Sequence, residues 1–330
     1  MRQIFASRCL MALAAVASLS QPAPAFPDDD KSYRAGIGLL NKGVNDLAAA
    51  ELRAYLRDNP DGSQAPNARY SLAVCLVRLS KHADAIAELE PVLALSDFEF
   101  APDALLLRAQ CATATGDDAG AVTSLNRLIA GFPKFAQLDR ATAALGESLY
   151  RLGKLDDAVT TLAHVTAKWP TSPVAPRAGL FAAMSEFSLR KFEAAASRAA
   201  HFRAKTPQGE HAANLALIEA QCRHQLASLP AATNLFEIAA STGQGSIRTE
   251  ALLGLASVAR SQRDFARAQQ ALTQAANPPP TGTLRERLTL EQGRLLLDQD
   301  KPDAALKLFA QLQSSAAQGQ GDHAAYWAAR

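Results

Sequence analysis

A single residue spacing dominates this sequence and restricts the chain to an array of similar units. An alanine recurs every 36 or 37 residues, at Ala48, Ala85, Ala121, Ala158, Ala195, Ala232, Ala268 and Ala305. Twelve positions before each alanine is a small residue, namely Gly36, Ala73, Ala109, Gly146, Ala183, Ala220, Ala256 or Gly293. Four positions after each alanine is an apolar residue, namely Leu52, Leu89, Leu125, Leu162, Ala199, Phe236, Leu272 or Phe309. All eight alanines have a small residue and an apolar residue at the same two spacings, which indicates tandem repeats.

The spacing predicts two antiparallel helices in each repeat, joined by a tight turn. The small residue of the first helix and the alanine of the second then lie where the two backbones approach most closely, and the apolar residue lies one helical turn further on. Gly43, Gly116 and Gly153 follow expected first helices, where a left-handed residue ends a helix at little cost. Pro91 falls inside an expected second helix, which predicts a kink or an early end there.

We therefore expect an all-α fold, a right-handed α-solenoid of about eight helix-turn-helix repeats that occupies residues 26–330. The repeats are expected at roughly 29–62, 66–100, 102–136, 139–172, 176–209, 213–245, 249–281 and 286–314. Residues 322–330 read as half of a ninth first helix. This half-helix either caps the array or shows that the sequence is the front part of a longer protein.

Residues 1–25 differ from the rest and are typical of a cleavable signal peptide. Arg2 and Arg8 give a positive start, and the largely apolar run of eleven residues at Cys9–Leu19 is too short to span a bilayer. Ala23-Pro24-Ala25 then supplies the small residues that signal peptidase needs. A membrane anchor or a buried helix is the alternative. We expect a periplasmic or secreted protein with no integral membrane segment after the leader is cleaved.

Charge and motif content argue against several classes of function. The chain has 34 Lys and Arg residues against 32 Asp and Glu residues, and two of the arginines lie in the leader. The balanced remainder gives no electrostatic basis for binding nucleic acid or an anionic membrane. The six histidines form no HExxH motif, and the sequence contains no GxSxG or GK[ST] segment. We expect no catalytic residue, no cofactor and no metal site, and therefore no enzyme.

Three cysteines lie at equivalent positions, each two residues after the small residue of a first helix. They are Cys75, Cys111 and Cys222. A disulfide is possible in an exported protein. However, neighbouring helices pack about 8–10 Å apart, and a disulfide needs Cα atoms within about 7 Å. We therefore expect buried, reduced thiols.

One repeat carries the clearest family resemblance. The order Leu145-Gly146, Gly153, Ala158, Leu162 and Pro170 resembles the tetratricopeptide repeat pattern. The period exceeds the usual 34 residues, and the additional residues lie in Pro-rich links such as 59–68 and 169–178. These links resemble those of bacterial envelope proteins of this family, such as the Tol-Pal-associated cell-division coordinator and the outer-membrane assembly lipoproteins. The lipid-carrying cysteine of the assembly lipoproteins is absent here, and so is the N-terminal coiled coil of the coordinator.

The resemblance implies a non-enzymatic scaffold that binds a protein or peptide partner at the cell envelope. In this family the first helices line the concave surface, so the candidate contact residues are Tyr33, Ile37, Tyr70, Val74, Arg78, Tyr150, Arg151, Met184 and Phe187. Several of these side chains could instead pack against neighbouring repeats. The alternative function is the superhelical, substrate-guiding part of a cell-wall enzyme of the lytic transglycosylase type, with its catalytic domain beyond this chain.

Two charged residues occupy positions where other repeats have leucine. Glu186 and Arg223 lie at equivalent places in the first helices of adjacent repeats, where Leu39, Leu76 and Leu149 occur elsewhere. They are expected to form either a salt bridge between repeats or a polar pocket for a charged group of the partner. Both residues therefore join the list of candidate contacts.

Overall fold

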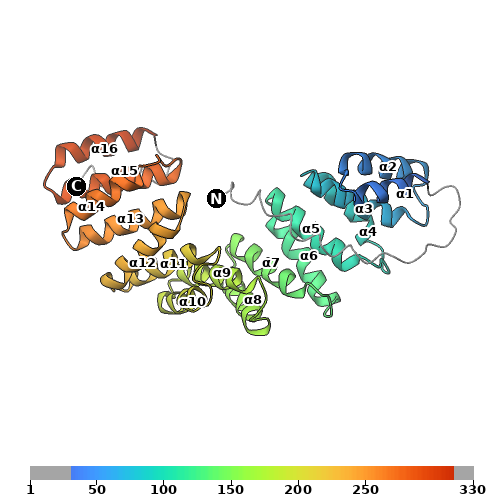
Figure 1. The fold of residues 1–330 in the computed structure, drawn as a ribbon, viewed down its shortest axis with the longest axis horizontal. Helices are drawn as coiled ribbons and strands as arrows, with labels where there is room; N and C mark the ends of the chain where they lie inside the picture. The colour runs from blue at the N-terminus through green and yellow to red at the C-terminus, as the bar shows by residue number, and fades with distance from the viewer. Residues whose placement is uncertain (1–30, 316–330) are drawn as a thin grey trace. The chain divides into compact units, whose positions relative to one another are not determined.

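The computed structural model describes residues 31–315, and all regular structure in this range is helical. Sixteen helices form eight consecutive pairs in these residues (Figure 1). The first helices of the repeats are α1 (Lys31–Asn41), α3 (Ala65–Arg78), α5 (Ala101–Thr115), α7 (Leu138–Arg151), α9 (Ala175–Ser188), α11 (Ala212–Gln225), α13 (Gly245–Ser261) and α15 (Thr283–Asp298). The second helices are α2 (Asn45–Asp58), α4 (His82–Leu93), α6 (Asp118–Gly131), α8 (Leu155–Lys168), α10 (Phe192–Lys205), α12 (Leu229–Thr242), α14 (Phe265–Ala275) and α16 (Pro302–Ser315). The expected all-α solenoid of helix-turn-helix repeats is confirmed.

The chain divides into two compact units, Met1–Ala104 and Leu105–Arg330, and the division falls within α5. The same stacking is present in each unit. The second helix of one repeat packs against the first helix of the next, as α2 does on α3 and α8 does on α9. Within each unit, a repeat therefore covers an apolar face of its neighbour, which a single helix pair could not bury by itself.

The alanines that set the period are among the most buried residues of the fold. Each of the eight has 0% of its surface exposed, and the apolar residue one turn later is buried in every repeat. The small residues of the first helices are buried as well. The predicted register of close contact between the two helices of each repeat is therefore confirmed.

The turn between the two helices uses one backbone conformation in all eight described repeats. Gly43, Gly116 and Gly153 have φ angles of 77°, 82° and 75°, as their positions after first helices predict. The equivalent residues of the other repeats also have positive φ, although none is glycine. They are Ser80, Arg190, Ala227, Arg263 and Asp300, with φ between 56° and 60°. The turn is thus left-handed regardless of the local sequence.

Three prolines lie within or at the start of second helices. Pro91 lies inside α4, which ends two residues later at Leu93 and has 12 residues, whereas most second helices have 14. The missing N–H of proline and its ring clash with the preceding turn explain the early end. Pro230 and Pro302 lie in the first turns of α12 and α16, where no helical N–H bond is lost.

Several expectations concern the ends of the chain and its thiols. The leader at residues 1–25 and the half-helix at residues 322–330 lie outside the described residues. In the described range, no helix combines the length and the apolar character that crossing a membrane requires. Cys75, Cys111 and Cys222 are buried and form no disulfide, as expected.

Candidate functional site

A groove of about 420 Å³ runs over the first helices of the last four repeats, entirely within the second unit. It is lined by α9, α11, α13 and α15, with one ring from α12. Its apolar side chains are Phe187, Phe236, Leu253 and Leu290. Its uncharged polar side chains are Gln221, Gln225 and Ser257, beside His224. Its charged side chains are Glu250, Arg287, Glu291 and Arg294.

The groove uses a fixed set of positions in the repeat. Counted from the small residue of each first helix, its residues lie at positions such as −3 (Leu253, Leu290), +1 (Gln221, Ser257, Arg294), +4 (Phe187, His224) and +5 (Gln225). Nine of the eleven candidate contacts occupy these same positions in their own repeats: Tyr33 and Tyr70 at −3, Ile37, Val74 and Met184 at +1, Tyr150 and Phe187 at +4, and Arg78 and Arg151 at +5. The choice of helix face therefore agrees with the groove, although only Phe187 lines it.

The charged residues of the groove form pairs of opposite sign. Arg294 Nη1 donates to Glu291 Oε1 at 2.6 Å, and Arg260 Nε lies 3.5 Å from Glu291 Oε2. Arg260 also pairs with Asp298. Arg287 Nη1 and Glu250 Oε2 are 4.0 Å apart. Each arginine that lines the groove thus has a carboxylate beside it.

His224 brings a titratable group into the groove. Its ring makes an edge contact with Phe236, at 6.4 Å between ring centroids. Burial lowers the pKa of His224 below its ordinary value, and the Glu291 carboxylate opposes this change only in part. The imidazole is therefore neutral at neutral pH.

The predicted tyrosines pack against other aromatic rings of the chain. Tyr33 lies 5.5 Å from Tyr55 of α2, and Tyr150 meets Phe181 of α9 at 5.6 Å. Tyr70 contacts both Phe98 and Phe100 of the link after α4. Burial raises the pKa values of Tyr70 and Tyr150. These rings thus serve packing within or between repeats, which was the alternative role considered for them.

The two predicted arginines at position +5 connect adjacent repeats. Arg78 Nη1 donates to the Leu40 carbonyl at 3.0 Å and to Asn45 Oδ1 at 3.3 Å, both in the preceding repeat. Arg151 Nε donates to Asp118 Oδ1 at 2.6 Å, also in the preceding repeat. Asp298, at the same position of the last pair, binds Arg260 of the repeat before it. Position +5 therefore holds neighbouring repeats together in three places.

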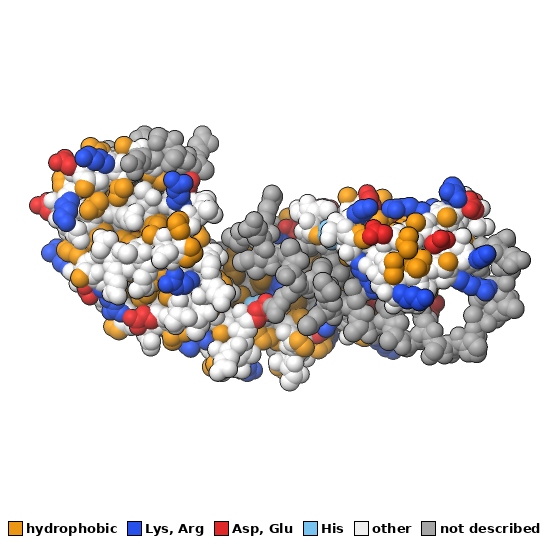
Figure 2. Space-filling view, turned by 45° about the horizontal axis from the view of Figure 1, so that its top comes forward, with side chains coloured by type: hydrophobic (Ala, Val, Ile, Leu, Met, Phe, Trp, Pro, Cys, Tyr) orange, Lys and Arg blue, Asp and Glu red, His pale blue; other side chains and the backbone are white. Residues whose placement is uncertain are grey.

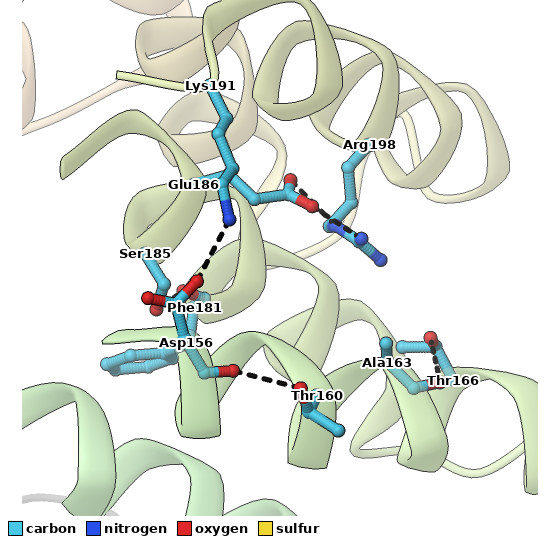
Figure 3. A network of polar contacts seen from close by, with 9 residues as sticks. All are labelled: Asp156, Thr160, Ala163, Thr166, Phe181, Ser185, Glu186, Lys191 and Arg198. Carbon is cyan, nitrogen blue, oxygen red and sulfur yellow. Dashed lines mark hydrogen bonds and ion pairs between the residues drawn. The ribbon is translucent and has the colours of Figure 1, made fainter. Parts of the chain in front are cut away.

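The expected salt bridge between Glu186 and Arg223 is wrong. Glu186 instead accepts two hydrogen bonds from Arg198 of α10, in its own repeat, at 2.9 and 2.6 Å (Figure 3). Only 5% of the Glu186 side chain is exposed, so the paired guanidinium stabilises a carboxylate that burial would otherwise penalise. Arg223 is half-buried and makes no ion pair within residues 31–315. The sequence did not identify Arg198, which lies on the second helix four residues before Phe202, as the partner of Glu186.

Buried glutamates paired with arginines also occur in the neighbouring repeats. Glu147 of α7 accepts two hydrogen bonds of 2.6 Å from Arg177 of α9. Glu219 of α11 pairs with Arg203 of α10 at 3.0 Å. These buried pairs lie in the body of the array, so they serve its internal structure and none lines the groove.

The face of the molecule shown in Figure 2 carries no large field of one sign, and the described residues hold no evident metal centre. Lys and Arg side chains are interspersed with Asp and Glu on the face shown in Figure 2. In residues 31–315 no group of three His, Cys, Asp or Glu side chains is arranged to hold a metal ion. The groove is the candidate site for another molecule, because it is concave and combines apolar and polar side chains.

Comparisons with known proteins agree with this architecture. The apo form of RapI has a similar fold, with a TM-score of 0.63 and 10% identity over 87% of this chain and 86% of that chain. The pilF protein of Pseudomonas aeruginosa gives a TM-score of 0.54 and 15% identity, covering 69% of this chain and 98% of its own. PilW, a type IV pilus biogenesis factor, gives 0.52 and 21%, covering 66% and 96%. No curated protein sequence matches the chain.

The family model for the tetratricopeptide repeat matches residues 33–97, 77–134 and 143–210. Together these segments cover just over half of the 330 residues. The matches fall on repeats that the alanine period marks and that the helix pairs reproduce. The chain belongs to the tetratricopeptide repeat family, whose arrays act as scaffolds for protein–protein interaction.

Proposed function

We propose that this protein is an exported adaptor of the bacterial cell envelope, which holds an extended segment of a protein partner in the groove along α9, α11, α13 and α15. The observation that carries this proposal is the groove itself. Its volume of about 420 Å³ lies in the range of binding pockets, and rings, aliphatic side chains and polar groups line it together. Four consecutive repeats contribute, so an elongated ligand fits better than a compact one.

The envelope location is supported by the first 25 residues. The positive start, the short apolar run and Ala23-Pro24-Ala25 together match a leader that signal peptidase removes. The Pro-rich links that resemble those of envelope members of the family point to the same compartment. The non-enzymatic role is supported by the family, whose arrays act as scaffolds for protein–protein interaction.

Binding in the groove is tested by obstructing it. Ser257 lies among the lining residues, and Ser257→Arg places a long charged side chain there. Gln270→Arg makes the same kind of change on the exposed surface of α14. A pull-down from envelope extracts, read by mass spectrometry, is expected to recover the same partner with the unmodified protein and Gln270→Arg and to lose it with Ser257→Arg. Equal recovery by both variants, with unchanged circular dichroism, would exclude this groove as the binding site.

Export is tested separately from binding. The full chain, expressed in a Gram-negative host, is expected in the osmotic-shock fraction with an intact mass that lacks residues 1–25. Ala25→Arg removes the small residue at the cleavage point, so this variant is expected to keep its leader. A chain that stays in the cytoplasm with an unchanged mass would contradict the envelope location.

A further inference from the structure

We infer that the groove along α9, α11, α13 and α15 selects an uncharged, extended polypeptide segment, bound through its backbone amides, and rejects segments that present carboxylate or phosphate groups. The inference rests on the proposed function, since it specifies the chemistry of the partner at the same groove. It follows from which polar groups of the groove are already paired and which are not.

The charges of the groove are neutralised by one another. Arg294 is held by Glu291 at 2.6 Å, and the weaker pair of Arg287 and Glu250 has its two charges 4.0 Å apart. The four charged lining residues sum to zero. An anionic ligand that approached either arginine would meet the neighbouring carboxylate, and replacing that carboxylate would leave it uncompensated in a half-buried place.

His224 adds no charge at neutral pH. Its ring contacts Phe236 on one side, and burial keeps it in the neutral form. A neutral imidazole offers one donor and one acceptor rather than an anion site. The basic side chains in the groove thus leave no unopposed positive charge for a phosphate or a carboxylate.

The uncharged polar groups are available to a ligand. Gln221 and Gln225 of α11 and Ser257 of α13 line the groove, and none of them hydrogen-bonds another of the described residues. A glutamine amide and a serine hydroxyl each donate and accept, so they match both the N–H and the C=O of a peptide group. An extended backbone presents both groups regularly along its length, whereas a charged end group satisfies only donors.

The apolar part of the groove completes the description of the ligand. Leu253, Leu290 and Phe236 are buried beneath the groove, and the half-buried ring of Phe187 lies along it. Successive side chains of an extended segment point to opposite sides. The side chains on one side of the bound segment would therefore be apolar and face these rings and leucines. Its backbone would contact Gln221, Gln225 and Ser257.

The experiment uses a phage-displayed library of random decapeptides, panned against the whole folded protein. We expect the enriched peptides to lack Asp, Glu and phosphate mimics at their centre and to carry apolar residues at alternate positions. Peptides synthesised from these sequences are expected to keep their affinity within about twofold when salt rises from about 0.05 to about 0.5 M, because screening acts on charged contacts. Gln221→Leu and Ser257→Ala are each expected to weaken binding roughly tenfold. Gln270→Arg, which lies outside the groove, is expected to change it by less than about twofold.

Two other results have distinct meanings. Enrichment of acidic peptides, whose binding falls with salt and with Arg287→Gln, would overturn the neutral selectivity while leaving the groove as the binding site. Peptides that bind Ser257→Arg as well as the unmodified protein would show that the groove is not used. That result would overturn the proposed function, and this inference with it.

Discussion

Leu162 of α8 lies directly over Gly146 of α7, so closely that a Cβ added to the glycine would be 2.4 Å from Leu162 Cγ. The same contact occurs at Gly36 with Leu52 Cγ, at 2.7 Å, and at Gly293 with the ring of Phe309. Sixteen residues separate the two partners in each case, which is the sum of the two spacings in the repeat pattern. The spacing pattern in the sequence therefore results from one packing contact that is repeated along the array.

Ala158 lies in this contact and is expected to tolerate no larger side chain. It has no exposed surface, so three additional carbon atoms would have to displace neighbouring atoms. Ala158→Leu is expected to lower the free energy of unfolding by about 1–3 kcal/mol, through overpacking. Ala167→Leu, on the exposed side of the same helix, is the matched control. Thermal melting of both variants checks this, and equal melting temperatures would contradict the proposed register.

The left-handed turn between the helices makes a second prediction. Ala227 has a φ of 56°, where its Cβ is strained, whereas Gly153 adopts a φ of 75° without that strain. Ala227→Gly is expected to stabilise the protein by about 1 kcal/mol, and Gly153→Ala to destabilise it by a similar amount. Urea unfolding of the two variants measures both. A change of the same sign in both would show that backbone strain does not govern this turn.

These turns also show how far the sequence predicts the fold. Glycine identified three of the eight turns, but Ser80, Arg190 and Ala227 have no local preference for positive φ. Their conformation follows from the packing of the two helices that they connect, which local propensity cannot reveal. The alanine period succeeded where local signals failed, because it reports the tertiary contact directly.

The site was predicted less completely than the fold. Most of the chosen residues lie on the helix face that lines the groove, because position in the repeat determines which side chains point outward. The chosen residues were the conspicuous rings and arginines, such as Tyr70 and Arg78, and these are occupied by contacts within the chain. The groove instead depends on Gln221, Ser257 and similar residues, whose composition is indistinguishable from that of an ordinary solvated helix surface.

The pair of Glu186 and Arg198 predicts a large asymmetry between two arginine substitutions. Arg198→Met leaves the Glu186 carboxylate buried without its guanidinium, which is expected to cost about 3–5 kcal/mol. Arg223→Met, the control, removes a half-buried arginine that has no ion pair in the described chain, and it is expected to change stability by less than about 1 kcal/mol. Chemical denaturation distinguishes them. The reverse order of effects would restore Arg223 as the partner of Glu186.

The buried cysteines are expected to be inert in the folded protein. Burial raises the pKa of Cys75 to about 11 and that of Cys222 to about 12, so almost none of either thiol is ionised near neutral pH. We expect both to react with a thiol reagent such as dithionitrobenzoate only after unfolding. The time course with and without guanidinium measures this, and peptide mass mapping assigns the sites. Rapid labelling of either residue in the native protein would contradict its burial.

His224 predicts a loss of stability in weak acid. Because its pKa is lowered in the folded protein, the unfolded chain takes up a proton first as the pH falls through about 6.5. Stability from this group is therefore complete above that value, declines as the pH falls through it, and levels off below the folded pKa. His224→Gln removes the titration and is expected to flatten this part of the profile. Denaturation midpoints of both proteins between about pH 8 and about pH 5 test this, and parallel profiles would show that His224 is equally protonated in the two states.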